Sequence, residues 1–143
     1  MKWLTQKECE SLLNSAKLQD RLLIEFLLSS GLRVMEVVSL KKSDLILEKQ
    51  EGLVIEGKGS KSRKLFYSIN VAKKLKNHLR NKNGKDFVFL YSQDKADAKS
   101  KTKAVRRMID SVRKTAGIER KITPHMLRHT FATNHFANNK NIL

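Results

Sequence analysis

The apolar residues in the first part of the chain recur with the period of α-helices. Thr5 can cap a helix that runs to about residue 17, because Glu8 stands three positions later and can bond back to the cap. Residues 19–31 form a second predicted helix, with apolar residues at core spacing and Gly31 able to adopt the left-handed conformation that ends it. A short third helix is predicted over residues 33–40.

The middle of the chain changes to short runs of β-branched and aromatic residues. These runs cover residues 45–50, 52–57 and 63–69, and glycine and lysine separate them. Such runs bounded by turn residues predict three strands, of which the second and third are joined by a hairpin turn.

Helical spacing returns in the second half of the chain. Apolar residues share one face over residues 70–81 and again over residues 103–117, where Gly117 can end the helix. A last helix is predicted from Thr123 as cap and Pro124 as its first residue, where a missing N–H does least harm. The elements predict one α+β domain over residues 1–143, mainly helical, with a small three-stranded antiparallel sheet.

Length and composition fit that single domain. The chain has 143 residues, 40% of them hydrophobic, which is enough for one core and too few for two. Cys9 is the only cysteine, which rules out an internal disulfide and a cysteine-based zinc cluster. No apolar run is long enough to cross a bilayer, so we expect a cytoplasmic protein without a membrane partner.

Positive charge is concentrated in the second part of the chain. The sequence has 30 Lys and Arg against 14 Asp and Glu, a net charge of +16. Residues 1–56 carry 8 basic and 9 acidic residues, whereas residues 57–143 carry 22 and 5. This asymmetry is typical of a protein that binds a polyanion, because each neutralised phosphate releases condensed counterions. A lysine-rich surface that only aids solubility is the alternative.

The stretch HMLRHTFAT places candidate chemistry at the start of the last helix. His125 and Arg128 share a face of that helix, with His129 four residues from His125. Zinc binding would need a third ligand, and none is in the local sequence. A phosphate fits better, since arginine donates two hydrogen bonds to its oxygens and histidine can add a bond or transfer a proton. Surface residues of an amphipathic helix remain an alternative.

Two further segments carry basic residues at distinctive positions. Arg33 follows the glycine that ends the second helix, and Glu36 stands three residues on. Lys58 lies between two glycines in the predicted hairpin turn, where a long side chain can project into a cleft.

The three pieces GLRVMEVVSL, GKGSKSR and HMLRHTFAT, in this order, resemble the catalytic domain of the tyrosine recombinase (phage integrase) family. The resemblance implies metal-free and cofactor-free transesterification of double-stranded DNA through a phosphotyrosine. It implies that the phosphate-binding and proton-transferring residues are Arg33, Lys58, His125 and Arg128. Glu36 would support Arg33, and the residues expected to contact DNA are Lys61, Arg63 and His129.

The sequence also departs from the family pattern. Family members carry a nucleophilic tyrosine after the HTFAT helix, whereas Tyr67 and Tyr91 precede it and are expected in the core. We therefore expect a fragment that lacks the N-terminal core-binding module and the tyrosine segment, and that does not cleave alone. Other recombinase protomers would be partners of the full-length protein. The alternatives are a non-catalytic DNA-binding module or decayed integrase, and an RNA-binding protein, which gives no reason for the ordered motifs.

Overall fold

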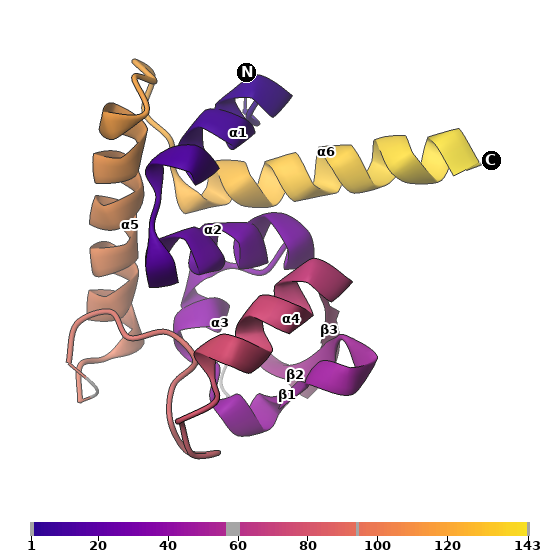
Figure 1. The fold of residues 1–143 in the computed structure, drawn as a ribbon, viewed down its shortest axis with the longest axis vertical. Helices are drawn as coiled ribbons and strands as arrows, with labels where there is room; N and C mark the ends of the chain where they lie inside the picture. The colour runs from indigo at the N-terminus through magenta and orange to yellow at the C-terminus, as the bar shows by residue number, and fades with distance from the viewer. Residues whose placement is uncertain (1, 57–60, 94, 143) are drawn as a thin grey trace.

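The computed structural model describes residues 2–56, 61–93 and 95–142, which are mainly helical with a small sheet at one end of the molecule (Figure 1). The helices are α1 (Gln6–Ser15), α2 (Leu18–Ser30), α3 (Val34–Val38), α4 (Ile69–His78), α5 (Ala98–Thr115) and α6 (Pro124–Ile142). Two short 3-10 helices are η1 (Lys42–Asp44) and η2 (Leu47–Lys49). None of the helices in these described ranges is long and apolar enough to cross a membrane.

Local sequence signals fix several helix ends where they were predicted. At α1, the Glu8 amide donates to Thr5 Oγ1 (3.1 Å) and the Thr5 amide donates to Glu8 Oε1 (2.9 Å). Helix α2 ends at Gly31 in the left-handed conformation, with φ of 68°. Helix α6 starts at Pro124, with the Met126 amide donating to the preceding threonine hydroxyl (3.3 Å).

The three strands form one antiparallel sheet, as predicted, and their order in it is β1-β2-β3. The strands are β1 (Leu45–Ile46), β2 (Glu51–Glu56) and β3 (Lys61–Phe66). The prediction of a strand over residues 45–50 was too long, since only its first two residues pair. The chain must reverse before residue 51, and η2 with Gln50 in the left-handed region (φ 51°) makes that turn.

Helix α5 begins five residues earlier than the predicted residue 103. Asp97 caps it, because its carboxylate accepts a hydrogen bond from the Ser100 amide (2.8 Å). The additional turn buries Lys101 and Thr102. The ammonium of Lys101 lies 3.3 Å from the centre of the Phe87 ring. Helix α5 is therefore anchored at its N-terminal end as well as along its apolar face.

The core is built around α2, which contacts both α4 and α6. Figure 1 shows α6 running alongside α2, with α5 on one side of the molecule. A Cβ atom at Gly31 would lie 2.3 Å from Cδ2 of Phe131, so glycine is needed for α6 to pack this closely. The buried Thr130 hydroxyl accepts a hydrogen bond from the Leu4 amide (2.8 Å), which ties α6 to the N-terminal segment. These contacts bring the start of α6 close to the residues that follow α2.

Candidate phosphate-binding site

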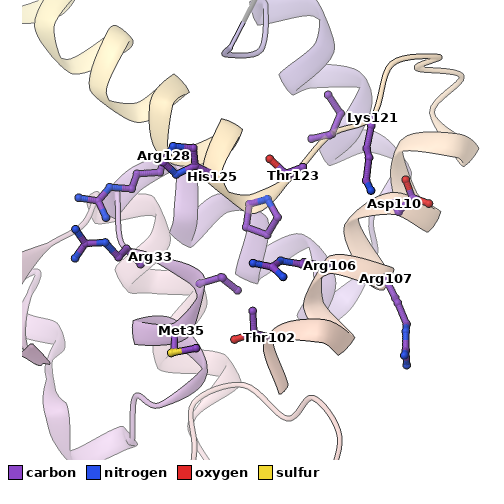
Figure 2. Close-up of a pocket in the computed structure, with 13 residues that line it drawn as sticks. Arg33, Met35, Thr102, Arg106, Arg107, Asp110, Lys121, Thr123, His125 and Arg128 are labelled. Carbon is purple, nitrogen blue, oxygen red and sulfur yellow. The ribbon is translucent and has the colours of Figure 1, made fainter. Parts of the chain in front are cut away.

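A pocket of about 810 Å³ lies between α3, α5 and the start of α6 (Figure 2). Its lining combines apolar side chains with five permanent cations. The cations are Arg33, Arg106, Arg107, Lys121 and Arg128. Among the described lining residues, Asp110 is the only carboxylate. The pocket is therefore suited to an anion.

Arg33 and Arg128 come from opposite ends of the chain and meet at this pocket. Figure 2 shows their guanidinium groups directed to the same side of it, with His125 beside Arg128. The Arg33 side chain is 63% exposed, and its nearest carboxylate oxygen, on Glu36, is 3.9 Å away. Arg128 makes no side-chain hydrogen bond or ion pair within the part of the chain that the structure describes. Both arginines are thus available to a ligand.

Glu36 has a different principal partner from the one expected. It was expected to support Arg33, and its carboxylate does accept the Arg33 backbone amide (2.9 Å). It also forms a two-bond ion pair with Arg63 of β3, at 2.6 and 3.0 Å. Burial of Glu36 disfavours its charge, but the bonds from Arg63 and Arg33 outweigh this and hold the pKa of Glu36 below its ordinary value.

The ion pair changes what is expected of Arg63. Its guanidinium, assigned to DNA from the sequence, is engaged with Glu36 and joins β3 to α3. The contact links residues 27 positions apart, so no local sequence pattern could reveal it. Binding of DNA by Arg63 stays a prediction.

His125 and His129 form a pair on α6. Their Nε2 atoms are 3.0 Å apart and the rings meet edge to face. When both rings are neutral, one Nε2 must donate and the other must accept, so the two rings take different tautomers. The described residues contain no group of three or more His, Cys, Asp or Glu side chains that could hold a metal ion.

The remaining predicted site residues are Lys58 and Lys61. Lys58 falls in residues 57–60, outside the described residues. Lys61 is exposed at the first position of β3, where it pairs in register with Glu56. The roles predicted for both lysines stay predictions.

Sequence reasoning missed the part of the pocket that α5 contributes. Arg106, Arg107 and the buried Thr102 line the pocket from this helix, and Lys121 lines it from the segment before α6. In the sequence these cations were visible only as part of the net charge, because their position depends on how α5 packs against α3.

Both tyrosines lie in the core, as expected from the sequence. Tyr67 is 6% exposed, and its hydroxyl donates to the backbone carbonyl of Glu51 (2.9 Å). Tyr91 is 8% exposed, and its hydroxyl donates to a carboxylate oxygen of Asp20. Burial raises the pKa of Tyr67 to about 12, and burial followed by the bond to Asp20 raises that of Tyr91 further. Neither tyrosine lines the pocket.

Comparisons relate the chain to proteins that are already known. The sequence profile of the phage integrase family matches residues 2–142. The chain is 37% identical over 136 residues to tyrosine recombinase XerA of Pyrococcus furiosus, which covers 92% of this chain and 47% of that protein. It is 36% identical over 130 residues to tyrosine recombinase XerC of Leptospira interrogans, which covers 88% of this chain and 40% of that protein.

Solved structures give the same relationship. A crystal structure of XerA recombinase superposes with a TM-score of 0.81 at 31% identity, covering 95% of this chain and 50% of that one. The XerH site-specific recombinase bound to its difH substrate superposes with a TM-score of 0.74 at 26% identity. This match covers 96% of this chain and 43% of that one. The chain belongs to the phage integrase family and has the fold of the tyrosine recombinases, as its motifs predicted. It spans about half the length of the relatives it matches.

Proposed function

We propose that the chain is the main part of the catalytic domain of a site-specific tyrosine recombinase, which breaks and rejoins DNA through a phosphotyrosine. The observation that carries the proposal is that Arg33 and Arg128, from opposite ends of the chain, line one pocket with His125. DNA as the partner is supported by the similarity to XerH, whose structure contains its difH substrate. Assembly with other recombinase protomers is part of the same proposal.

In this proposal the pocket stabilises the charge that develops on a phosphodiester under attack. The two arginines donate to the non-bridging oxygens, and their charges are fixed before the reaction begins. Arg33 is held at its backbone by Glu36, so its position does not depend on the ligand. The N-terminal end of α6 adds a partial positive charge at the same pocket.

The proton transfers follow from the chemistry of the exchange. A tyrosine oxygen forms a bond to phosphorus while the bond from phosphorus to the 5′ oxygen breaks. His125 accepts the tyrosine proton, and Lys58, proposed from the sequence alone, gives a proton to the departing 5′ oxygen. The reverse steps reseal the strand. Tyr67 and Tyr91 are buried away from the pocket, so we propose that the nucleophile comes from outside these 143 residues.

The burial of both tyrosines also favours a second candidate, a DNA-binding module that does not cleave. Such a module would use the same basic pocket to hold a phosphate without activating it. The two candidates therefore agree on binding and differ in what the pocket does to a reactive phosphodiester.

The binding part is tested with Arg33→Ala and Arg128→Ala by fluorescence anisotropy on duplex DNA. Each substitution should weaken binding roughly 5- to 10-fold near 0.1 M salt, the contribution of about one phosphate contact. Arg80→Ala is the matched control, since Arg80 is exposed after α4 and does not line the pocket. An equal loss of affinity in all three variants would indicate that DNA is attracted by the overall positive charge, and it would contradict the assigned site.

The catalytic part is tested on thymidine 3′-(4-nitrophenyl phosphate) with a small added nucleophile, by following release of nitrophenolate. A catalytic pocket should accelerate this release, and Arg33→Ala or Arg128→Ala should remove about tenfold or more of the effect. No acceleration would favour the non-cleaving module.

On a nicked DNA duplex the chain alone should form no covalent adduct, and an adduct lost in Tyr67→Phe or Tyr91→Phe would refute the assignment of the tyrosines.

A further inference from the structure

The wall of the pocket opposite Arg33 and Arg128 carries a third arginine that the proposed reaction does not use. Figure 2 shows the Arg106 side chain leaving α5 toward the side where Arg33 and Arg128 lie. The side chain of the next residue, Arg107, is directed away from them in the same view. Both arginines line the pocket, but only the Arg106 side chain is directed toward Arg33 and Arg128.

Arg106 lacks a partner within the described ranges of the chain. It makes no hydrogen bond or ion pair there, and it is exposed to solvent. Asp110, the one carboxylate among the described residues of the lining, forms ion pairs with two cations of its own helix, Arg113 at 2.9 Å and Lys114 at 3.3 Å. The charge of Arg106 is therefore uncompensated and available to an anion from outside the protein.

The helix that carries Arg106 is firmly held. Its neighbours Val105 and Ile109 are fully buried, and Lys101 stacks on the Phe87 ring one turn before. A guanidinium on such a helix loses little backbone freedom when it binds, which favours a defined contact over a diffuse attraction.

We propose that Arg106 binds a second phosphate of the DNA, next to the one held by Arg33 and Arg128. The inference rests on the proposed function and extends it to a neighbouring position on the nucleic acid. The pocket volume of about 810 Å³ lies within the range of about 300–1,000 Å³ that suits ligands larger than one phosphate. The cations and the start of α6 make the wall attractive to an anion, whereas a base edge is neutral.

The test compares Arg106→Gln with Lys103→Gln, each of which removes one positive charge from an exposed position of α5, and of these two residues only Arg106 lines the pocket. Binding to several duplexes of unrelated sequence is measured by anisotropy over a salt series. Arg106→Gln should weaken binding about 8-fold near 0.1 M salt and lower the salt slope by about 0.9, equally for every duplex. Lys103→Gln should change affinity less than about twofold, and circular dichroism should show both variants folded.

Three outcomes would overturn the proposal. Equal losses in the two variants would mean diffuse electrostatics, and a loss confined to particular sequences would mean that Arg106 reads a base. An unchanged Arg106→Gln would mean no contact at all. Arg106→Lys keeps the charge and should keep the salt slope, which tests the same contact if the glutamine variant does not fold. Failure of the proposed function would show separately, as unchanged binding by Arg33→Ala and Arg128→Ala.

Discussion

At the scale of single residues, the contact between His125 and His129 constrains where the two imidazole rings carry their hydrogens. The two Nε2 atoms are 3.0 Å apart, so when both rings are neutral one Nε2 carries a hydrogen and the other accepts it. Sequence spacing indicated that the rings share a face of α6, but only the structure brings the two nitrogens into contact.

We predict that exactly one ring of this pair is in the Nδ1–H tautomer when both are neutral. Long-range ¹H–¹⁵N NMR spectra of the imidazole nitrogens measure this directly. His78 is an internal reference, because its Nε2 lies 2.7 Å from the carbonyl oxygen of Val88 and must donate to it. In His129→Phe, the ¹⁵N shifts of His125 should move while those of His78 stay. Two Nε2–H rings in the wild-type protein would contradict the contact.

At the scale of elements, the approach of α6 to the end of α2 brings Arg128 to Arg33. Gly31 makes this possible in two ways, through its left-handed backbone (φ 68°) and through the absence of a Cβ that would meet Phe131 at 2.3 Å. Gly117 also has a positive φ (76°), but nothing lies within 4 Å of its Cβ position. Comparing the same substitution at the two glycines therefore separates the cost of backbone strain from the cost of steric overlap.

We predict that Gly31→Ala destabilises the fold more than Gly117→Ala does. The backbone term is about 1–2 kcal/mol for each alanine. Overlap with Phe131 should add about 1–3 kcal/mol at Gly31 only. Urea unfolding measures the free energy of unfolding of each variant. Equal losses in the two variants would show that α6 shifts away from the added methyl group without a measurable loss of stability. Gly31→Ala should also weaken DNA binding, since any shift of α6 separates Arg128 from Arg33.

A second link between elements is the ion pair of Glu8 on α1 with Arg120, which precedes α6. Two hydrogen bonds of 2.8 and 2.9 Å join them, and Arg120 also donates to the Trp3 carbonyl (2.7 Å). The bonds from Arg120 lower the pKa of Glu8 from 4.5 to about 2. Because the folded pKa is the lower one, the stabilisation is complete above about pH 4.5 and is lost as the pH falls toward 2.

We predict that Glu8→Gln lowers the free energy of unfolding by about 1–2 kcal/mol at pH 7. The difference from the wild type should shrink as the pH is lowered from 5 to 2, as followed by urea unfolding at each pH. Glu10→Gln is the matched control, since Glu10 lies on the same helix and accepts only a 3.4 Å bond from Gln6. A difference that does not change with pH would contradict the ion pair as its source.

The predicted and observed ends of the helices and strands differ in a way that shows which features the sequence could predict. Helix ends marked by local chemistry, at Thr5, Gly31 and Pro124, were predictable because cap and helix are neighbours in the chain. The end of the first strand was not, because β1 stops where the chain must turn into β2. The motifs predicted Arg33, His125 and Arg128, which line one pocket in the structure. The place of Arg106 in that lining depends on the packing of α5 against α3 and has no local sequence signal.

At the scale of the whole molecule, the two parts of the chain contribute differently to the pocket. Residues 1–56 are nearly neutral and supply Arg33, while residues 57–143 carry the excess of positive charge and supply α5 and α6. In Figure 1 these two helices meet where α6 begins, and that junction forms part of the pocket wall. The fold therefore gathers the basic part of the sequence around one arginine from the neutral part.

We predict that binding to duplex DNA weakens steeply and linearly on logarithmic axes as salt rises. Contacts from Arg33, Arg106 and Arg128 alone would give a slope of about −2.7, which is roughly a 40-fold loss between 50 and 200 mM salt. Other exposed lysines can only make it steeper. A duplex with an uncharged peptide nucleic acid backbone is the control, and it should bind weakly with no salt response. A flat response to salt on DNA would remove the electrostatic basis of the proposed site, whatever the arginine variants did.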